Sequence, residues 1–72
     1  MITTAEAERL REGVTRMLDG KPNAHVREVA LELDENARVA RAAGYDPAPI
    51  EALADAYRAV LADRLRWDAP DG

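Results

Sequence analysis

Two breaks divide the chain into three segments, and they constrain the fold more than any other feature. The breaks are residues 19–23 (DGKPN) and 44–47 (GYDP). Glycine readily adopts the left-handed conformation in which helices end, and proline cannot continue a helix. No segment shows the alternation of β-branched and polar residues that is typical of strands. The sequence therefore predicts an all-α protein, a three-helix bundle or helical array with helices at roughly 3–19, 24–43 and 47–66.

The first segment has a clear helix start. Thr3 and Glu6 have the spacing of a capping box, in which each side chain satisfies an N–H at the helix start. Apolar residues then recur at helical spacing and form one stripe, which predicts a single buried face. The members of this stripe are Leu10, Val14, Met17 and Leu18.

The middle segment carries apolar residues on two sides. Asn23 is a suitable N-cap for this helix. At about 100° per residue, one face holds Val26, Val29, Ala30, Leu33, Ala37 and Ala40, and the other side holds Leu31, Val39 and Ala42. A helix that is apolar on two sides is usually buried on two sides, so the second side suggests a partner chain. The alternative is a break near residues 34–36, with a new helix that turns Val39 inward.

The third segment has the strongest start signal. Asp46 can cap the helix, Pro47 suits its first position, and Tyr45 and Ile50 occupy the positions of a hydrophobic staple. The apolar stripe consists of Ile50, Leu53, Ala54, Tyr57, Val60, Leu61 and Leu65. Trp67 begins a short polar tail, residues 67–72, and the sequence leaves open whether it closes the core or meets a partner.

Length and composition predict one domain, residues 1–72, with a thin core. Hydrophobic residues make up 47% of the 72, but alanine is the commonest of them and aromatic residues are only 4%. Domains of this size bury only about 60% of the surface of the unfolded chain and often need a disulfide, a metal or a partner. The chain has no cysteine. We therefore expect association with itself or with another protein to complete the core.

The side chains do not assemble a catalytic or metal site. Without serine or cysteine, no nucleophile of the Ser/His/Asp or Cys/His kind can form. His25 and Glu28 could supply two metal ligands, but no further ligands follow at matching spacing. Three carboxylates each have an arginine at helical spacing, which predicts the surface ion pairs Asp34–Arg38, Asp55–Arg58 and Asp63–Arg66. The sequence predicts a protein that is not an enzyme, with no metal, cofactor or small-molecule substrate.

Nothing in the sequence indicates a membrane protein. No apolar run approaches the roughly 18 residues of a membrane span. The N-terminal residues lack the basic and apolar regions of a secretory signal. We expect a soluble protein of the cytoplasm.

Residues 39–53 resemble the helix-turn-helix signature of repressor-type DNA-binding proteins. A small residue, a turn glycine and an aliphatic residue are spaced in that family as Ala40, Gly44 and Ile50 are here. Supporting apolar positions match Val39, Ala43, Tyr45 and Leu53. The resemblance covers less than a quarter of the chain, and any helical corner with a glycine turn favours similar residues. It implies a DNA-binding regulator, either antitoxin-like or a phage-type repressor.

The charges at the matching positions argue against nucleic acid. The residues that would read bases are Asp46, Pro47, Ala48, Glu51, Ala52 and Asp55. None is of the usual base-reading types, and three are carboxylates that would face phosphates. The chain also has a net charge of -4, whereas DNA affinity depends largely on basic groups.

The sequence therefore favours a small helical module for protein–protein interaction. Such a chain would be a homo-oligomer, an assembly factor or an accessory subunit of a larger complex. The candidate interface residues are Leu31, Val39, Ala42 and Trp67. The helix-turn-helix regulator is the alternative.

Overall fold

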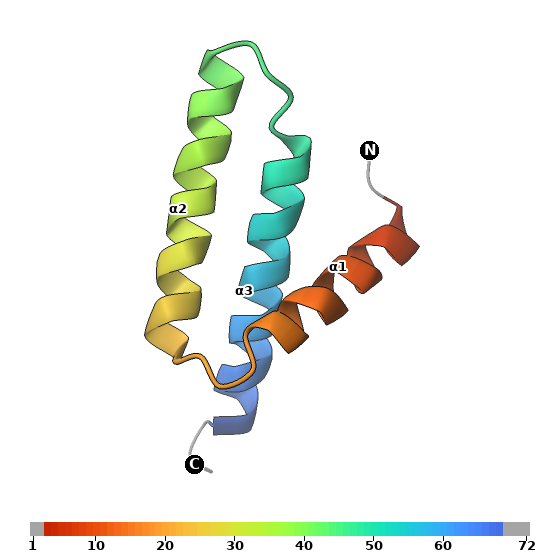
Figure 1. The fold of residues 1–72 in the computed structure, drawn as a ribbon, viewed down its shortest axis with the longest axis vertical. Helices are drawn as coiled ribbons and strands as arrows, with labels where there is room; N and C mark the ends of the chain where they lie inside the picture. The colour runs from red at the N-terminus through yellow and green to blue at the C-terminus, as the bar shows by residue number, and fades with distance from the viewer. Residues whose placement is uncertain (1–2, 69–72) are drawn as a thin grey trace.

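The computed structural model describes residues 3–68, and this range forms three helices and no strand. They are α1 (Thr4–Met17), α2 (Asn23–Ala42) and α3 (Ala48–Asp68) (Figure 1). The all-α prediction is confirmed. Each helix begins and ends within two residues of the predicted bounds, and α2 is continuous through residues 34–36.

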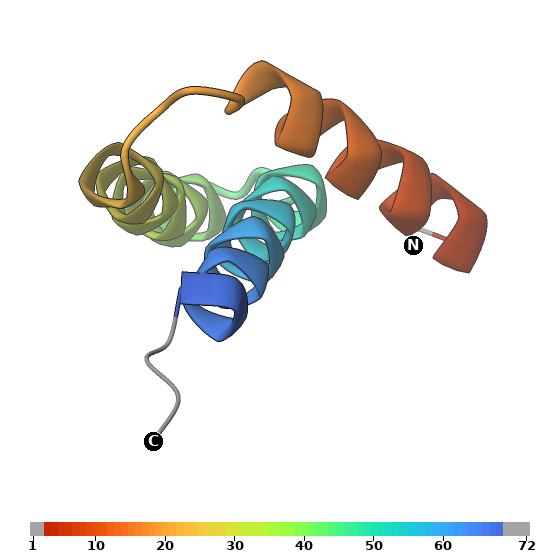
Figure 2. The same ribbon diagram turned by 90° about the horizontal axis from the view of Figure 1, so that it is seen from below.

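The last helix of the chain, α3, is the central one. It packs against α2 and against α1, whereas the backbones of α1 and α2 stay apart within the described residues. Viewed from below, α3 lies between the other two (Figure 2). We expected a partner chain to cover the second apolar side of α2. Within the chain, α3 is the helix covered from two sides, and the second side of α2 with Leu31 and Val39 is exposed.

The caps of the first two helices differ in outcome. The hydroxyl of Thr3 accepts a hydrogen bond from the Glu6 N–H at 3.1 Å, which confirms the cap of α1. The predicted cap of α2 is wrong, because Pro22 is its N-cap residue and Asn23 is already helical, with no side-chain cap bond. The Asn23 side-chain oxygen instead accepts a hydrogen bond from Arg64 of α3 at 3.3 Å.

The turn between α2 and α3 follows its predicted chemistry in part. Gly44 has a φ of 88°, and the N–H groups of Gly44 and Tyr45 donate to the Arg41 and Ala40 carbonyls, which is a Schellman motif. The Asp46 carboxylate accepts a hydrogen bond from the Ala48 N–H at 3.0 Å. Tyr45 is 73% exposed, so the expected staple buries little of its side chain.

The hydrophobic core lies along α3, on the sides that face α1 and α2. Its main cluster of buried residues is Val14, Leu18, Val26, Ala30, Ala56, Tyr57 and Val60, and Ala37 and Ala54 are buried as well. The predicted stripe of α2 is confirmed, since all of its members are buried or half-buried. Two predicted core residues are exposed, Met17 at 56% and Leu65 at 46%, because each lies at the edge of its stripe near a helix end. Ala56 is buried although we did not predict it, because it belongs to the side of α3 that meets α1.

The end of α3 limits what can be said of the predicted tail. The backbone of Trp67 and Asp68 continues the helix, so residues 67–72 do not all form a tail. The Trp67 side chain and residues 69–72 lie outside the described part of the structure. Whether Trp67 belongs to the core or to an interface therefore stays a prediction.

Candidate interaction surfaces

The outer flank of α2, by which we mean the side with Leu31, Val39 and Ala42, is exposed. Leu31 is 63% exposed and Val39 is 54% exposed, and Ala42 is exposed as well. Leu31 and Val39 are eight residues apart, which places them about 12 Å apart along the helix axis. Glu35 and Arg38 lie between them in sequence and form an ion pair. The three candidates therefore do not form one continuous apolar patch, and singly exposed apolar residues are common on protein surfaces.

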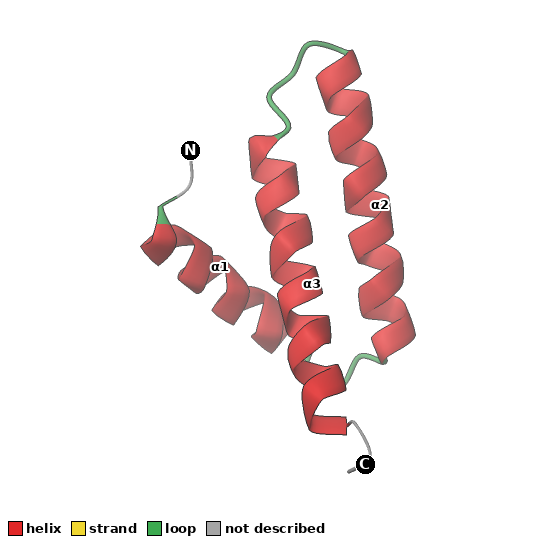
Figure 3. Cartoon of the chain, turned by 180° about the vertical axis from the view of Figure 1, so that it is seen from behind, coloured by secondary structure: helices red, strands yellow, loops and turns green. Residues whose placement is uncertain are grey.

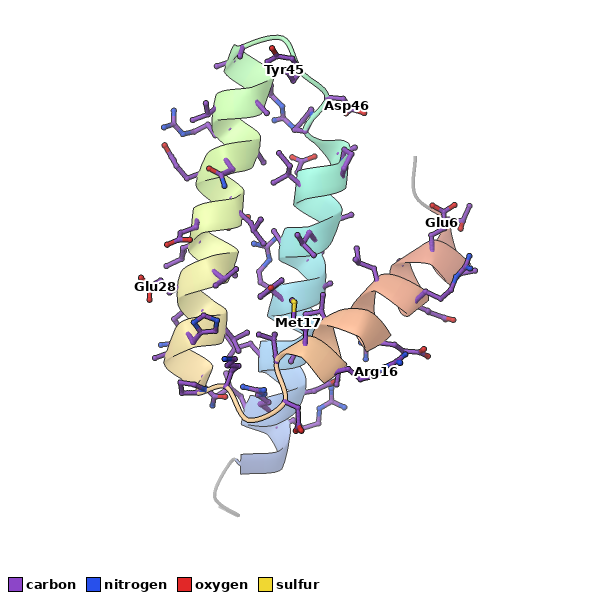
Figure 4. The ribbon with its side chains drawn as sticks, in the orientation of Figure 1. Glu6, Arg16, Met17, Glu28, Tyr45 and Asp46 are labelled. Carbon is purple, nitrogen blue, oxygen red and sulfur yellow. The ribbon has the colours of Figure 1, made fainter. Side chains whose placement is uncertain are left out.

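A second group of apolar side chains borders the buried core where α1 and α2 pack on α3. We call this group the open face, and it consists of Leu10, Met17, Val29, Leu33 and Leu53. Met17 is exposed, and the other four are half-buried and pack against the buried core. Met17 projects from the C-terminal end of α1 beside α3, on the side that faces α2 (Figure 4). The open face gathers side chains from all three helices, which the outer flank does not.

The sequence could have pointed to the open face, but the signal was indirect. Each of its members was predicted as core. The informative pattern is Ala52, Ala56 and Ala59, which recur at helical spacing on α3 outside its main stripe. Such a row of small residues indicates a second helix contact on α3. Because α1 and α2 pack on different sides of α3, their backbones stand apart, and the apolar side chains between them are only partly buried.

A network of ion pairs joins α2 to α3. Arg58 donates to both Asp34 carboxylate oxygens, at 2.7 and 2.8 Å, and also to Asp55 at 2.5 Å. Arg41 donates to Glu51 at 2.8 Å. The hydrogen bonds that Arg58 donates to Asp34 and Asp55 raise the pKa of its guanidinium, which stays charged. This network stabilises the pairing of the two helices and gives no group suited to proton transfer, since both partners remain solvated.

Two of the three predicted ion pairs form, and one is wrong. Arg58 contacts Asp55, and Arg66 contacts Asp63 at 2.8 Å. Asp34 does not pair with Arg38, because the Arg58 guanidinium reaches it from α3 with two hydrogen bonds. Arg38 instead forms an ion pair with Glu35, whose pKa is lowered by this hydrogen bond.

The remaining polar features of the described residues are a histidine at the start of α2 and an open polar groove. Residues 3–68 contain no group of three or more histidine or acidic side chains that could hold a metal ion. His25 is exposed on the first turn of α2. An open groove of about 600 Å³ between α1 and α3 is lined by six polar residues: Glu8, Arg11, Glu12, Thr15, Arg16 and Asp63. Its charges are solvated, and they include the ion pair of Arg11 with Asp63.

The residues of the helix-turn-helix resemblance lie at one end of the molecule. Ala40 and Ile50 are half-buried on either side of the turn at Gly44. Here α2 and α3 run antiparallel and side by side, as seen from behind (Figure 3), whereas helix-turn-helix pairs cross at about 90–120°. Two residues at the base-reading positions, Glu51 and Asp55, are engaged by arginines of α2 and α3.

Comparison with other proteins adds no family to these observations. No protein-family model matches the chain, and no curated protein or solved structure matches it. No helix within residues 3–68 has the length and the apolar character needed to cross a bilayer.

Proposed function

We propose that the chain is a small helical module that works by binding another polypeptide, either a second copy of itself or a subunit of a larger assembly. The open face carries this proposal. It brings together five large apolar side chains from three helices, and none of them is fully covered by the chain itself. Covering such side chains stabilises a complex by about 25 cal/mol per Å² of apolar surface, before the costs of association.

The outer flank of α2 is the second candidate surface. Leu31 and Val39 are as exposed as Met17, but they stand apart on a helix side that also carries charges. Glu28, on this same helix, points away from α3 (Figure 4). A partner that covered this flank would have to accommodate these charges. We therefore rank the flank below the open face as a docking surface.

One substitution on each surface separates the two candidates. Met17→Lys places a charge on the open face, and Leu31→Lys places the same charge on the outer flank. Both positions are more than half exposed, so both variants should fold. The helix dipole also stabilises a lysine in the last turn of α1. Circular dichroism confirms the fold of each variant before association is compared.

Sedimentation at up to high micromolar concentration detects self-association. A photo-crosslinking residue at position 17 or 31, expressed in the native host, detects another partner. We expect association that Met17→Lys removes and Leu31→Lys preserves. The reverse pattern would move the binding surface to the outer flank. A strictly monomeric chain with no crosslinked partner from either position would reject the proposal.

The alternative function is a helix-turn-helix regulator of the cytoplasm, supported by the spacing of Ala40, Gly44 and Ile50. Fluorescence anisotropy with duplex DNA at low salt tests it under the most permissive condition. Binding that weakens steeply with added salt would favour this function. A flat titration at low salt would exclude it.

A further inference from the structure

The packing that holds α1 to the rest of the molecule begins at Leu10. Residues 4–9 are all exposed, and the buried residues on this side of the molecule, Val14 and Leu18, lie in the second half of α1 and directly after it. The first half of α1 borders a groove of about 360 Å³, lined by Ala7, Arg11, Ala52, Asp55, Ala56 and Ala59. Figure 3 shows the N-terminal end of α1 well away from α3. The backbone of α1 also stays apart from that of α2 in the described residues.

One side chain of α3 fastens the end of α1 and the following loop. The half-buried Arg64 donates to the Leu18 carbonyl at 2.6 Å and to the Lys21 carbonyl at 2.6 Å, as well as to the Asn23 side chain. The Leu18 carbonyl is at the C-terminal end of α1, where carbonyls lack helical partners and the dipole attracts a cation. Arg64 therefore ties the end of α1, the following loop and the first residue of α2 to α3.

We propose that α1 is an arm that opens separately from the α2–α3 pair, with residues 19–22 as its hinge and Arg64 as its latch. The hinge contains Gly20, whose φ is 81°, and its four residues are exposed. Opening breaks the packing of Leu10, Val14 and Leu18 against the core, the ion pair of Arg11 with Asp63 and the Arg64 hydrogen bonds. It leaves the interface of α2 with α3 and the ion pairs of Arg58 and Arg41 intact. The proposal concerns motion within the chain and does not depend on the proposed function.

Hydrogen exchange of the purified chain, followed amide by amide, tests the arm. Local opening predicts that amides in residues 8–18 exchange about tenfold or more faster than the slowest amides of α2 and α3. Their exchange should also depend weakly on added denaturant, because opening exposes little surface. If the protected amides of all three helices exchange at one common rate, the chain unfolds only as a whole and the arm is rejected.

Substitutions test the latch. Arg64→Ala should raise the exchange of residues 8–18 by a further factor of about ten, since it removes hydrogen bonds from a charged donor. Arg64→Lys keeps the charge but cannot bridge the same acceptors, so a smaller change in the same direction is expected. Arg38→Ala is the matched control, because within the described residues Arg38 pairs with Glu35 of its own helix.

The outcomes are distinct. Faster exchange confined to α1 in the Arg64 variants, with Arg38→Ala unchanged, supports the latch. An equal rise in all three helices, or no rise in α1, would overturn it. If Arg64→Ala does not fold, Arg64→Lys is compared with Arg38→Lys in the same experiment, and the same two results decide.

Discussion

α1 and α2 pack against different sides of the same helix, yet they are attached in different ways. α2 presents buried residues along most of its length, from Val26 through Ala30 to Ala37, and ion pairs to α3 run beside them. α1 relies on a shorter stretch, from Leu10 through Val14 to Leu18, on the ion pair of Arg11 with Asp63, and on polar contacts near its C-terminal end. The number of turns that meet α3 therefore decides how firmly each helix is held, and the two helices differ in this more than in length.

The largest expected effect comes from the point where α1 is anchored. Leu18 is 2% exposed, and Leu18→Ala removes buried methyl groups and leaves a cavity, so it should lower the free energy of unfolding by about 3 kcal/mol. Met17→Ala is the neighbouring control, and it should cost less than about 1 kcal/mol because Met17 is largely exposed. Urea unfolding followed by circular dichroism measures both. Equal losses would show that anchoring is spread along α1.

The next effect compares how closely side chains are packed around two alanines of α3. Ala54 is 0% exposed, so Ala54→Leu should overpack its surroundings and lower the free energy of unfolding by about 1–3 kcal/mol. Ala59 is half-buried and lines the groove beside α1, where a larger side chain has room, so Ala59→Leu should change stability by less than about 1 kcal/mol. Thermal unfolding of the two variants gives the comparison. A larger loss for Ala59→Leu would mean that the α1 side is the tighter one.

Much of the fold could be predicted because its signals are local. Glycine and proline mark both turns, and the 3.6-residue period identifies the buried side of α2 correctly. The Thr3 cap was predictable for the same reason, since its partner Glu6 lies three residues away. The Asn23 cap was not, because its side chain is engaged by Arg64, which is 41 residues away in the sequence.

The arrangement of the helices and the candidate site depended on distant contacts. An alanine contributes little to an apolar stripe, so Ala56 was a weak indication that α1 packs on this side of α3. The apolar residues Leu31 and Val39 of α2 suggested a covered second side, but periodicity does not say which helix stands in the middle. Met17 was predicted as core because it lies on the apolar stripe of its helix. A stripe shows which side of a helix is buried, but not how far the neighbouring helix covers that side, and Met17 is largely exposed.

A smaller effect separates the ion pairs on the two sides of α3. Arg58 bridges Asp34 and Asp55, whereas Arg11 makes one contact of 3.3 Å with Asp63. Arg58→Ala should therefore lower the free energy of unfolding by up to about 1 kcal/mol, since the groups are about half exposed. Arg11→Ala should cost clearly less. Unfolding in low and high salt checks the origin, because screening should reduce the difference between the two variants.

The smallest expected effect concerns the ion pair of Arg38 with Glu35, which lies within α2 and does not join two helices. The hydrogen bond from Arg38 lowers the pKa of the Glu35 carboxyl in the folded chain, and the charge of Arg38 adds to this. The stabilisation by this pair is fully present above the ordinary pKa of a glutamate and is lost as the pH falls through the lowered value. Carboxyl carbon shifts measured by NMR against pH should thus show Glu35 titrating below an ordinary glutamate.

Arg38→Gln removes this cause and should return the Glu35 midpoint to the ordinary range, while Arg41→Gln, which removes the nearby pair with Glu51, should leave it in place. The pair lies within α2 and not between helices, so Arg38→Gln should also leave the hydrogen exchange of α1 unchanged. A Glu35 midpoint that moves equally in both variants would show that the field of the whole α2–α3 network sets it. In that case the interface between these helices would be coupled electrostatically along its length, and the contrast with α1 would be larger than packing alone provides.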